Sequence, residues 1–302
     1  MKWRWIQPFK GMEPPIICPR FWKLQFAYGC PLDCHYCYLL GTYYRQSPYQ
    51  HPPTYYKDMT LEAFRNELLD FFDKTGEPQL LNTGELADST MFEGQEFFGA
   101  SFSNFIIPLF ERQRRHKVLF LTKIANISNI VEIPNAIGKV KQTIMSFSMN
   151  PPEVAREANE TQNISHRIES AKRCFESGYE IRMRIDPMIP IPNWRLQYKN
   201  LIDEMFDAFI PQRITLGSLR INNPRLPSLR PRFWNVWKPR MIHLGRGKYR
   251  FPPTLDREMY SHIIDLLDNK GYNGDIALCK ELVEVWDGLD LDYRSCKCNC
   301  VL

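Results

Sequence analysis

Short apolar runs alternate with amphipathic helical patterns along most of the sequence, and this alternation constrains the fold more than any other feature. A strand, a helix and a further strand in succession form a βα unit, and such units build parallel sheets. Strands are expected at 24–27, 79–83, 118–121, 143–147, 180–185 and 214–217, and Pro187 and Pro190 are expected to end the fifth of them. Helices are expected at 60–72, 104–115, 165–177 and 194–209.

Six strand–helix repeats predict an α/β fold, a partial (β/α)6 TIM-like barrel with a small C-terminal extension. In barrels of this kind, ligands bind beyond the carboxyl ends of the strands. The sequence divides into a barrel at 1–218, a basic aromatic capping segment at 219–254, and an extension at 255–302 that holds a helix at 255–269, a strand at 275–278 and a helix at 280–286.

The composition agrees with a folded protein large enough to enclose a cofactor. Of the 302 residues, 44% are apolar and 24% are charged, which excludes intrinsic disorder, collagen repeats and coiled coils. No apolar run approaches the roughly 20 residues of a membrane-spanning helix, and residues 1–15 lack the apolar core of a secretory signal. We therefore expect a cytoplasmic protein without a membrane partner.

Nine cysteines occur in clusters, and in a chain without a secretory signal this pattern favours metal or redox chemistry over disulfides. Cys30, Cys34 and Cys37 form a CxxxCxxC loop just after the first predicted strand. Three thiolates can bind three irons of a [4Fe–4S] cluster and leave the fourth iron open for S-adenosylmethionine (SAM). The alternatives are a structural zinc loop, for which His35 is badly placed as a fourth ligand, and buried thiols without a metal.

The stretch YGCPLDCHYCYL at 28–39 resembles the cluster loop of radical SAM enzymes and is most similar to the spore photoproduct lyase branch. The resemblance implies an enzyme that uses a [4Fe–4S] cluster and SAM, with a reductase such as flavodoxin or ferredoxin as electron donor. Further similarity extends over about 24–281 and includes LNTGELADS at 81–89, SFSMNPPEV at 146–154, the segment 167–190, ITLGSLR at 214–220 and LCKE at 278–281.

The same resemblance implies roles for individual residues. Tyr38 matches a tyrosine that relays a hydrogen atom back towards SAM, although a packing role for this ring is an equal alternative. For Glu85 and Lys123, the alternative to SAM binding is that they are solvated charges at strand ends. The implied SAM contacts are Tyr36 for adenine, Thr83, Gly84 and Glu85 for the methionine ammonium, Lys123 for its carboxylate, and Ser146 and Ser148 for the ribose.

This sequence lacks the hydrogen-donor cysteine that spore photoproduct lyases carry in the segment corresponding to 84–89. It ends instead in a CxCxC motif, which we interpret as ligands of an auxiliary iron–sulfur cluster, as redox thiols with Cys298 as a catalytic candidate, or as a loose tail. An extended run would turn the three thiols to one face and Lys297 and Asn299 outward. The motif is Cys296, Cys298 and Cys300.

Three further cysteines fit core packing. Cys18 and Cys174 are expected to be packing residues. Cys279 is either a packing residue on a predicted strand or a fourth ligand to the tail cluster.

The positive charge of the chain is local. The formal net charge is +5, and residues 220–250 hold nine Lys or Arg and no acid, so the other residues sum to 5 − 9 = −4. Basic groups beside aromatic rings suit a nucleic-acid backbone with unstacked bases. The alternative is a lid over the barrel mouth in which the rings pack inward. The aromatic residues of the segment are Phe233, Trp234, Trp237 and Tyr249.

These features favour a radical SAM enzyme that acts on a small molecule or peptide, aided by a cluster on the tail cysteines. A pyrimidine-dimer repair lyase is the first alternative. Atypical SAM cleavage with 3-amino-3-carboxypropyl transfer and a non-enzymatic iron or zinc protein are the others.

Overall fold

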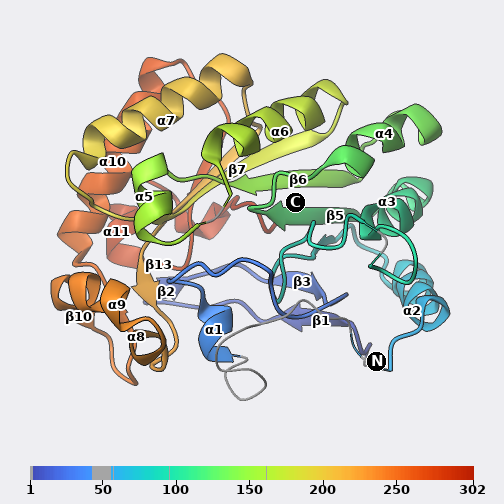
Figure 1. Cartoon of the computed structure of the whole chain (residues 1–302), viewed down its shortest axis with the longest axis horizontal. Coiled ribbons are helices and arrows are strands. Elements are labelled where there is room, and N and C mark those ends of the chain that lie inside the picture. The colour runs from blue at the N-terminus through green and yellow to red at the C-terminus, as the bar shows by residue number, and fades with distance from the viewer. Residues whose placement is uncertain (1–2, 43–55, 57, 95, 161) are drawn as a thin grey trace.

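The computed structural model describes residues 3–42, 56, 58–94, 96–160 and 162–302. An eight-stranded sheet in the order β1-β3-β4-β5-β6-β7-β8-β12 forms its centre (Figure 1). Strands β3 to β8 and β12 run parallel, and β1 is antiparallel at one edge. The fold class predicted from the sequence, a partial α/β barrel, is confirmed. The strands are β1 (Ile6–Phe9), β3 (Phe21–Leu24), β4 (Leu80–Asn82), β5 (Lys117–Thr122), β6 (Thr143–Ser148), β7 (Glu180–Met188), β8 (Arg213–Ser218) and β12 (Asp275–Leu278).

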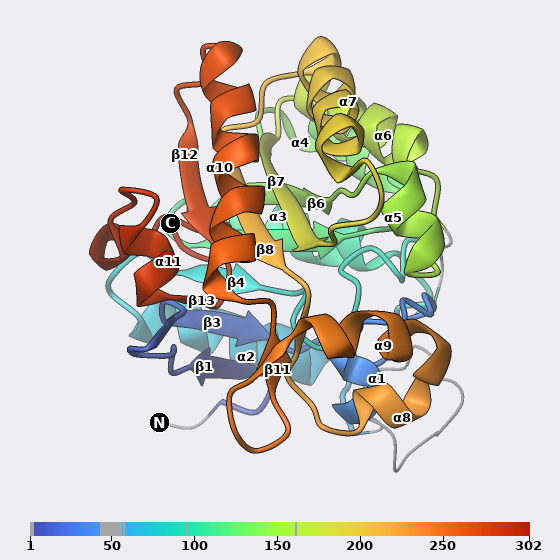
Figure 2. The same cartoon turned by 90° about the vertical axis from the view of Figure 1, so that its left-hand side faces the viewer.

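Helices cover the outer face of the sheet (Figures 1 and 2). In the first of them, Thr60 accepts a hydrogen bond from the backbone N–H of Ala63 and thereby caps the helix, as its sequence predicts. Phe64, Leu68 and Phe71 then recur at helical spacing and are buried against the sheet. The covering helices are α2 (Leu61–Lys74), α3 (Phe102–Gln113), α4 (Ser128–Ile137), α6 (Ile164–Glu176), α7 (Trp194–Ala208) and α10 (Pro253–Asn269).

Three strands differ from the sequence prediction. The first parallel strand is β3 rather than 24–27, because Phe21–Leu24 pairs with β1, a partner that the pattern did not show. Strand β7 continues past Pro187 to Met188: its ladder to β8 is irregular there and resumes at Met188 opposite Ser218. Strand β12, predicted within a separate extension, pairs with β8 and so joins the barrel sheet.

The capping segment packs inward. Trp234 and Trp237 are 0% and 2% exposed, and the ring of Phe233 contacts the ring of His35 on the cysteine loop. These tryptophans cannot stack on unpaired bases as placed, which favours the lid interpretation of the segment. Its elements are β9 (Arg220–Ile221), α8 (Leu226–Leu229), α9 (Pro231–Trp237), the 3-10 helix Lys238–Arg240, β10 (Ile242–His243) and β11 (Tyr249–Arg250).

The C-terminal tail is built into the barrel, beside β12 (Figure 2). The Arg182 guanidinium donates to the carbonyl oxygens of Asn299 and Val301, and Arg213 donates to those of Cys298 and Val301. The interpretation of a loose tail is therefore wrong. The remaining short elements are β2 (Ile16–Ile17), α1 (Tyr38–Thr42), α5 (Pro152–Glu157), β13 (Glu281–Leu282), α11 (Val283–Asp287) and the 3-10 helix Tyr293–Ser295.

Asn299 faces the barrel interior and is fully buried, contrary to the expected outward orientation. Its side-chain amide donates to Ser146 Oγ and to the Met183 carbonyl, each at 2.9 Å. Thr215 Oγ1 donates to Asn299 Oδ1 at 2.8 Å and accepts from the Asn299 backbone N–H. The interior offers these polar partners, so the amide is more stable inside than in water.

Replacing Asn299 with Ala is expected to lower the free energy of unfolding by about 3 kcal/mol, because Ser146, Thr215 and the Met183 carbonyl lose buried hydrogen bonds. Denaturant unfolding followed by circular dichroism measures the change. Lys297→Ala is the matched control, since its ion pair with Asp275 is exposed and contributes less than about 1 kcal/mol. Equal effects of the two changes would contradict a structural role for the buried amide.

None of the helices in the described part of the chain is both long and apolar enough to cross a membrane.

Candidate functional site

A cavity opens at the carboxyl ends of the parallel strands, the place expected for the ligands of a barrel. It encloses about 1030 Å³, part of which is open to solvent. Strands β6 and β7, the loops after β3, β4, β5, β8 and β12, and the C-terminal tail all contribute to its wall. The residues proposed from the sequence that line it are Tyr36, Cys37, Tyr38, Gly84, Glu85, Lys123, Ser148, Cys298 and Cys300.

The cysteine loop bends tightly between β3 and α1. The Cys37 N–H donates to the Cys34 carbonyl at 3.0 Å, and the His35 N–H donates to the Ala158 carbonyl, which fixes the loop against the end of α5. Cys34 is buried, and Cys30 and Cys37 are half-buried. All three thiols are free, and burial raises their pKa values, so they are neutral until a metal displaces their protons.

The donor set fits an iron–sulfur cluster. The loop supplies three free cysteines, which is the number of thiolates that a cluster with one open iron needs, and Cys37 reaches the cavity. Among the described residues, no three His, Cys, Asp or Glu side chains are arranged as ligands of one metal ion. A [4Fe–4S] cluster does not require that arrangement, because each thiolate binds a different iron.

A buried ion network that the sequence did not reveal connects this loop to strands β5 and β6. Glu160 accepts from Tyr36 Oη, from Arg167 Nη1 at 2.7 Å and from Asn150 Nδ2 at 2.9 Å, and its carboxylate lies 3.2 Å from Lys123 Nζ. Burial alone would raise the pKa of Glu160. The charges of Lys123 and Arg167 outweigh burial and lower that pKa to about 2, so the carboxylate is ionised at neutral pH.

This network positions the predicted SAM-binding side chains. The Lys123 ammonium lies 5.5 Å from the centre of the Tyr36 ring, and Arg167 also donates to the Ser148 carbonyl at the end of β6. Asp88 accepts from the Lys123 backbone N–H at 2.8 Å and so ties the 81–89 segment to β5. Lys123 therefore lines the cavity, and its ammonium is already paired with the Glu160 carboxylate.

The segment after β4 approaches its neighbour closely. A Cβ atom at Gly84 would lie 2.5 Å from Leu121 Cβ, so only glycine fits at this edge of the cavity. Tyr38, the first residue of α1, donates its hydroxyl to the Glu85 carbonyl. Tyr38 also lines the cavity.

Two predicted SAM contacts lie elsewhere. Thr83 is buried and hydrogen-bonds with the Leu119 carbonyl and with Ser89 Oγ, and Ser146 accepts from the tail amide of Asn299. Neither is part of the cavity wall, whereas Gly84, Glu85 and Ser148 are. Ser146 and Ser148 are two residues apart on β6 and share one face of the strand, and Ser146 lies deeper in the barrel.

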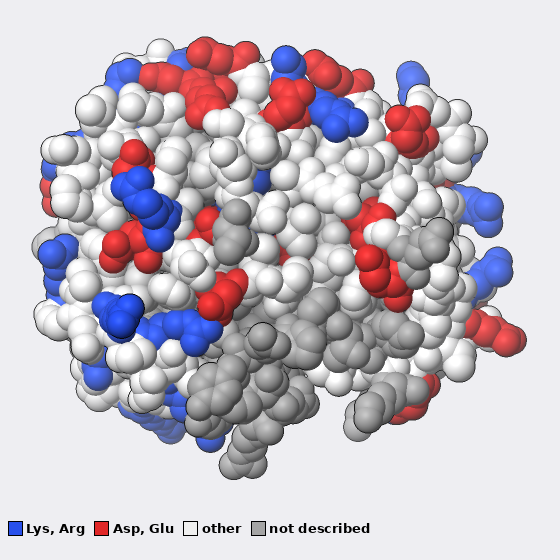
Figure 3. Space-filling view, in the orientation of Figure 1, with Lys and Arg blue, Asp and Glu red and all other residues white. Residues whose placement is uncertain are grey.

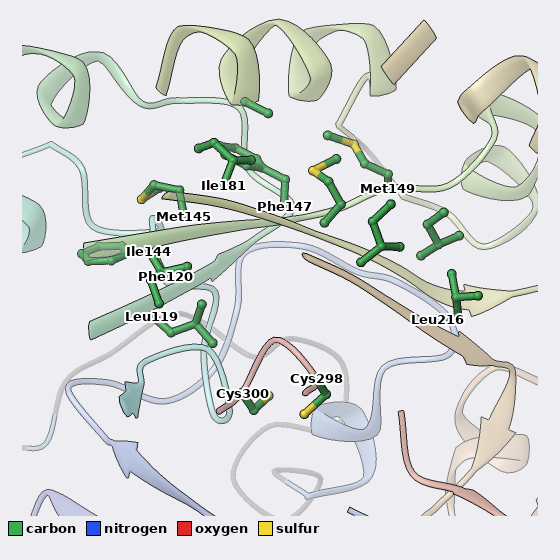
Figure 4. Close-up of a cluster of buried hydrophobic side chains, with 14 of the residues drawn as sticks. Leu119, Phe120, Ile144, Met145, Phe147, Met149, Ile181, Leu216, Cys298 and Cys300 are labelled. Carbon is green, nitrogen blue, oxygen red and sulfur yellow. The ribbon is translucent and has the colours of Figure 1, made fainter. Parts of the chain in front are cut away.

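Two of the three tail cysteines, Cys298 and Cys300, line the same cavity, and Cys18 and Cys279 join them in its wall. Cys296, the third predicted ligand of the tail, is not part of that wall. Figure 4 shows Cys298 and Cys300 on the turn of the tail, under the apolar side chains of the sheet. Cys174 is instead fully buried in α6, as a packing cysteine should be. The packing prediction for Cys18 overlooked this convergence, because sequence spacing gave no sign of it.

A family model described as spore photoproduct lyase matches residues 20–219, which span the cysteine loop and the strands that line the cavity. The chain belongs to the spore photoproduct lyase family. This family membership confirms the radical SAM resemblance of the cluster loop.

Individual members of the spore photoproduct lyase family match over part of their length. The chain is 27% identical over 196 residues to spore photoproduct lyase of Clostridium acetobutylicum, covering 62% of this chain and 52% of that protein. It is 25% identical over 205 residues to the Bacillus subtilis protein, covering 64% and 53%. The chain therefore spans about half the length of the curated relatives it matches.

Several solved structures share the fold. Spore photoproduct lyase complexed with dinucleoside spore photoproduct superimposes with a TM-score of 0.68 at 15% identity, over 90% of this chain and 79% of that one. A mutant with bound AdoMet and the dinucleoside gives 0.70 at 16% identity, over 89% and 78%. Streptococcus suis SuiB bound to S-adenosylmethionine gives 0.54 at 13%, over 87% and 50%.

Proposed function

We propose that this chain is a radical SAM enzyme that binds a [4Fe–4S] cluster through Cys30, Cys34 and Cys37 and SAM in the adjoining cavity. The observation that carries the proposal is that Cys37 and five of the seven implied SAM contacts, which are scattered over the sequence, line one cavity at the barrel mouth. When bound, the cluster supplies the electron that cleaves SAM and releases a 5′-deoxyadenosyl radical. A reductase such as flavodoxin or ferredoxin is the proposed source of that electron.

The residues of the chain bind and orient the cofactor. Lys123 attracts the methionine carboxylate, Glu85 and the open backbone edge at Gly84 receive the ammonium, and Ser148 hydrogen-bonds the ribose. The Tyr36 ring borders the space for the adenine. The inward-packed capping segment and the tail close the barrel on two sides, which keeps water from a reactive radical.

The proposed substrate is a small molecule or peptide held in the cavity. The structure of SuiB bound to its precursor peptide has the same fold, with a TM-score of 0.55.

Anaerobic incubation of the reconstituted, reduced protein with SAM tests the proposal. We expect 5′-deoxyadenosine, measured by chromatography, and its amount should rise when a substrate is present. Methylthioadenosine as the main product would redirect the reaction to 3-amino-3-carboxypropyl transfer. Absence of both products from protein that carries its cluster would contradict the proposal.

A second candidate function is repair of a pyrimidine dimer in nucleic acid, favoured by family membership and by a basic surface. Lys and Arg side chains gather over α8, α9 and β10, at the lower left of Figure 3. A hydrogen donor for such a reaction would have to come from the tail thiols, since the segment 84–89 has none. The exposed basic residues of this region are Arg225, Arg232, Arg240, Arg246 and Lys248.

The double change Arg232→Glu and Arg246→Glu is expected to weaken binding of a dimer-containing oligonucleotide. It should also reduce the slope of log Kd against log salt by about 1 for each phosphate that the surface no longer neutralises. Fluorescence anisotropy at several salt concentrations measures both quantities. Arg65→Glu, at an exposed position of α2, is the control. Binding that is equally salt-dependent in all three proteins would exclude this surface as the nucleic-acid site.

A further inference from the structure

We propose that Cys18, Cys279, Cys298 and Cys300 are the ligands of a second iron–sulfur cluster inside the barrel, at the wall of the cavity that Cys37 also lines. The sequence predicted the three tail cysteines as cluster ligands, with Cys279 as an alternative fourth ligand. The structure adds Cys18. Cys296 does not line this cavity, although its thiol hydrogen-bonds that of Cys298. The inference of this site rests on the positions of the four cysteines. Only its role beside SAM rests on the proposed function.

The first observation is the convergence of four thiols from three distant parts of the chain. Cys18 follows the short strand β2, Cys279 follows β12, and the other two lie on the inserted tail. All four line the cavity. The Cys298 thiol hydrogen-bonds those of Cys296 and Cys300, so the tail thiols lie in contact. Cysteines that only fill space in the core have no reason to converge on one cavity wall from three distant parts of the chain.

The second observation is that buried cations face the sulfur atoms. Arg184 Nη2 lies 3.2 Å from Cys300 Sγ, and Arg220 Nη2 lies 3.3 Å from Cys279 Sγ. Asn82 Nδ2 adds a third donor, 3.5 Å from Cys300 Sγ. These N–H groups are the outer contacts that orient thiolate ligands and adjust the potential of a cluster.

Charge balance favours thiolates at these positions. Among the described residues, Arg184 and Arg220 share Asp186 as their carboxylate partner, at 3.9 and 3.0 Å, and both guanidinium groups are only 14% exposed. Two positive charges and one negative charge leave an excess positive charge in a nearly buried site, which is costly. Metal-bound thiolates at Cys300 and Cys279 would supply the missing negative charge, whereas neutral thiols would not.

An all-sulfur donor set is typical of iron–sulfur clusters and of zinc. All four thiols border the cavity, so a cluster that they hold would lie at its wall. Four protein thiolates leave a [4Fe–4S] cluster without an open iron, so this centre would carry electrons beside SAM and would not chelate the substrate.

Iron and sulfide analysis of the full-length chain after anaerobic reconstitution tests the site. With Cys30, Cys34 and Cys37 all changed to Ala, we expect about four irons and four sulfides to remain per chain. The further changes Cys18→Ala and Cys279→Ala should reduce both values to less than about one. The matched control is Cys174→Ala in the same background, which should keep the cluster because Cys174 lies away from the cavity.

A second comparison avoids dependence on a heavily substituted chain. In the otherwise unchanged protein, Cys18→Ala with Cys279→Ala should lower the iron content from about eight to about four, with the circular dichroism spectrum retained. The proposal is overturned if the iron content is unchanged by that pair, if the variant without the first loop binds no iron, or if it binds zinc alone. Failure of the proposed SAM chemistry would appear separately, as absence of SAM cleavage by the unchanged protein.

Discussion

Replacing Cys34 with Ala is expected to abolish reductive SAM cleavage while the barrel remains folded. The thiol of Cys34 is one of three proposed cluster ligands, and two thiolates on this loop do not hold a [4Fe–4S] cluster firmly. We expect the rate of 5′-deoxyadenosine formation to fall at least about 1,000-fold, which corresponds to more than about 4 kcal/mol in the barrier. The fold should survive, because the loop between β3 and α1 lies outside the strand ladder.

The control for this change is Cys174→Ala, which removes a cysteine that is fully buried in α6 and far from the site. It should cost stability by leaving a small void, yet leave SAM cleavage intact. Chromatography of the nucleoside products, with iron content and circular dichroism of each variant, separates the two effects. Turnover retained in a folded Cys34→Ala variant would refute the assignment of the cluster loop.

The strand–helix alternation predicts the barrel because each repeat is encoded locally. Apolar runs such as 118–121 and 143–147 become β5 and β6 with boundaries shifted by one residue at most. Pairing partners are not encoded locally, which is why β1 and the barrel position of β12 were missed. Both are short strands whose place depends on ladders to residues far along the chain.

In the site as well, residues with a local sequence signal were predicted, and residues whose roles depend on distant contacts were not. The spacing of the cysteine loop and the family resemblance of the strand ends predicted a shared site for Cys37, Gly84, Glu85 and Lys123. All four line one cavity. Glu160 and Cys18 carry no local signal, since a lone acid or thiol between ordinary neighbours is usually a surface or packing residue. Asn299 lies in the CxCxC motif, but the alternation of that motif predicted the wrong orientation for its side chain. Their roles arise from contacts across many residues in sequence, such as Glu160 with Tyr36.

Replacing Glu160 with Gln is expected to lower the free energy of unfolding at pH 7 by about 3 kcal/mol. The pKa of Glu160 is about 2 in the folded chain against an ordinary value of 4.5, and a shift of that size corresponds to about 3 kcal/mol. Because the folded-state pKa is lowered, this stability is present above about pH 4.5 and is lost as the pH falls towards 2. A neutral amide would leave Lys123 and Arg167 without their carboxylate and would have no such pH dependence.

The control is Glu157→Gln, which makes the same chemical change at an exposed position on α5. Denaturant unfolding at pH 7 and at pH 3.5 should show a large difference between the wild-type and Glu160→Gln proteins at the higher pH and a smaller one at the lower. Equilibrium dialysis should also show weaker SAM binding by Glu160→Gln, because Tyr36 and Lys123 are both held by this carboxylate. If Glu160→Gln loses stability but binds SAM as the wild type does, the network supports only the fold. If it loses no more stability than Glu157→Gln at either pH, the buried carboxylate does not hold the two cations, and the positioning of Lys123 must come from Asp88 and β5 alone.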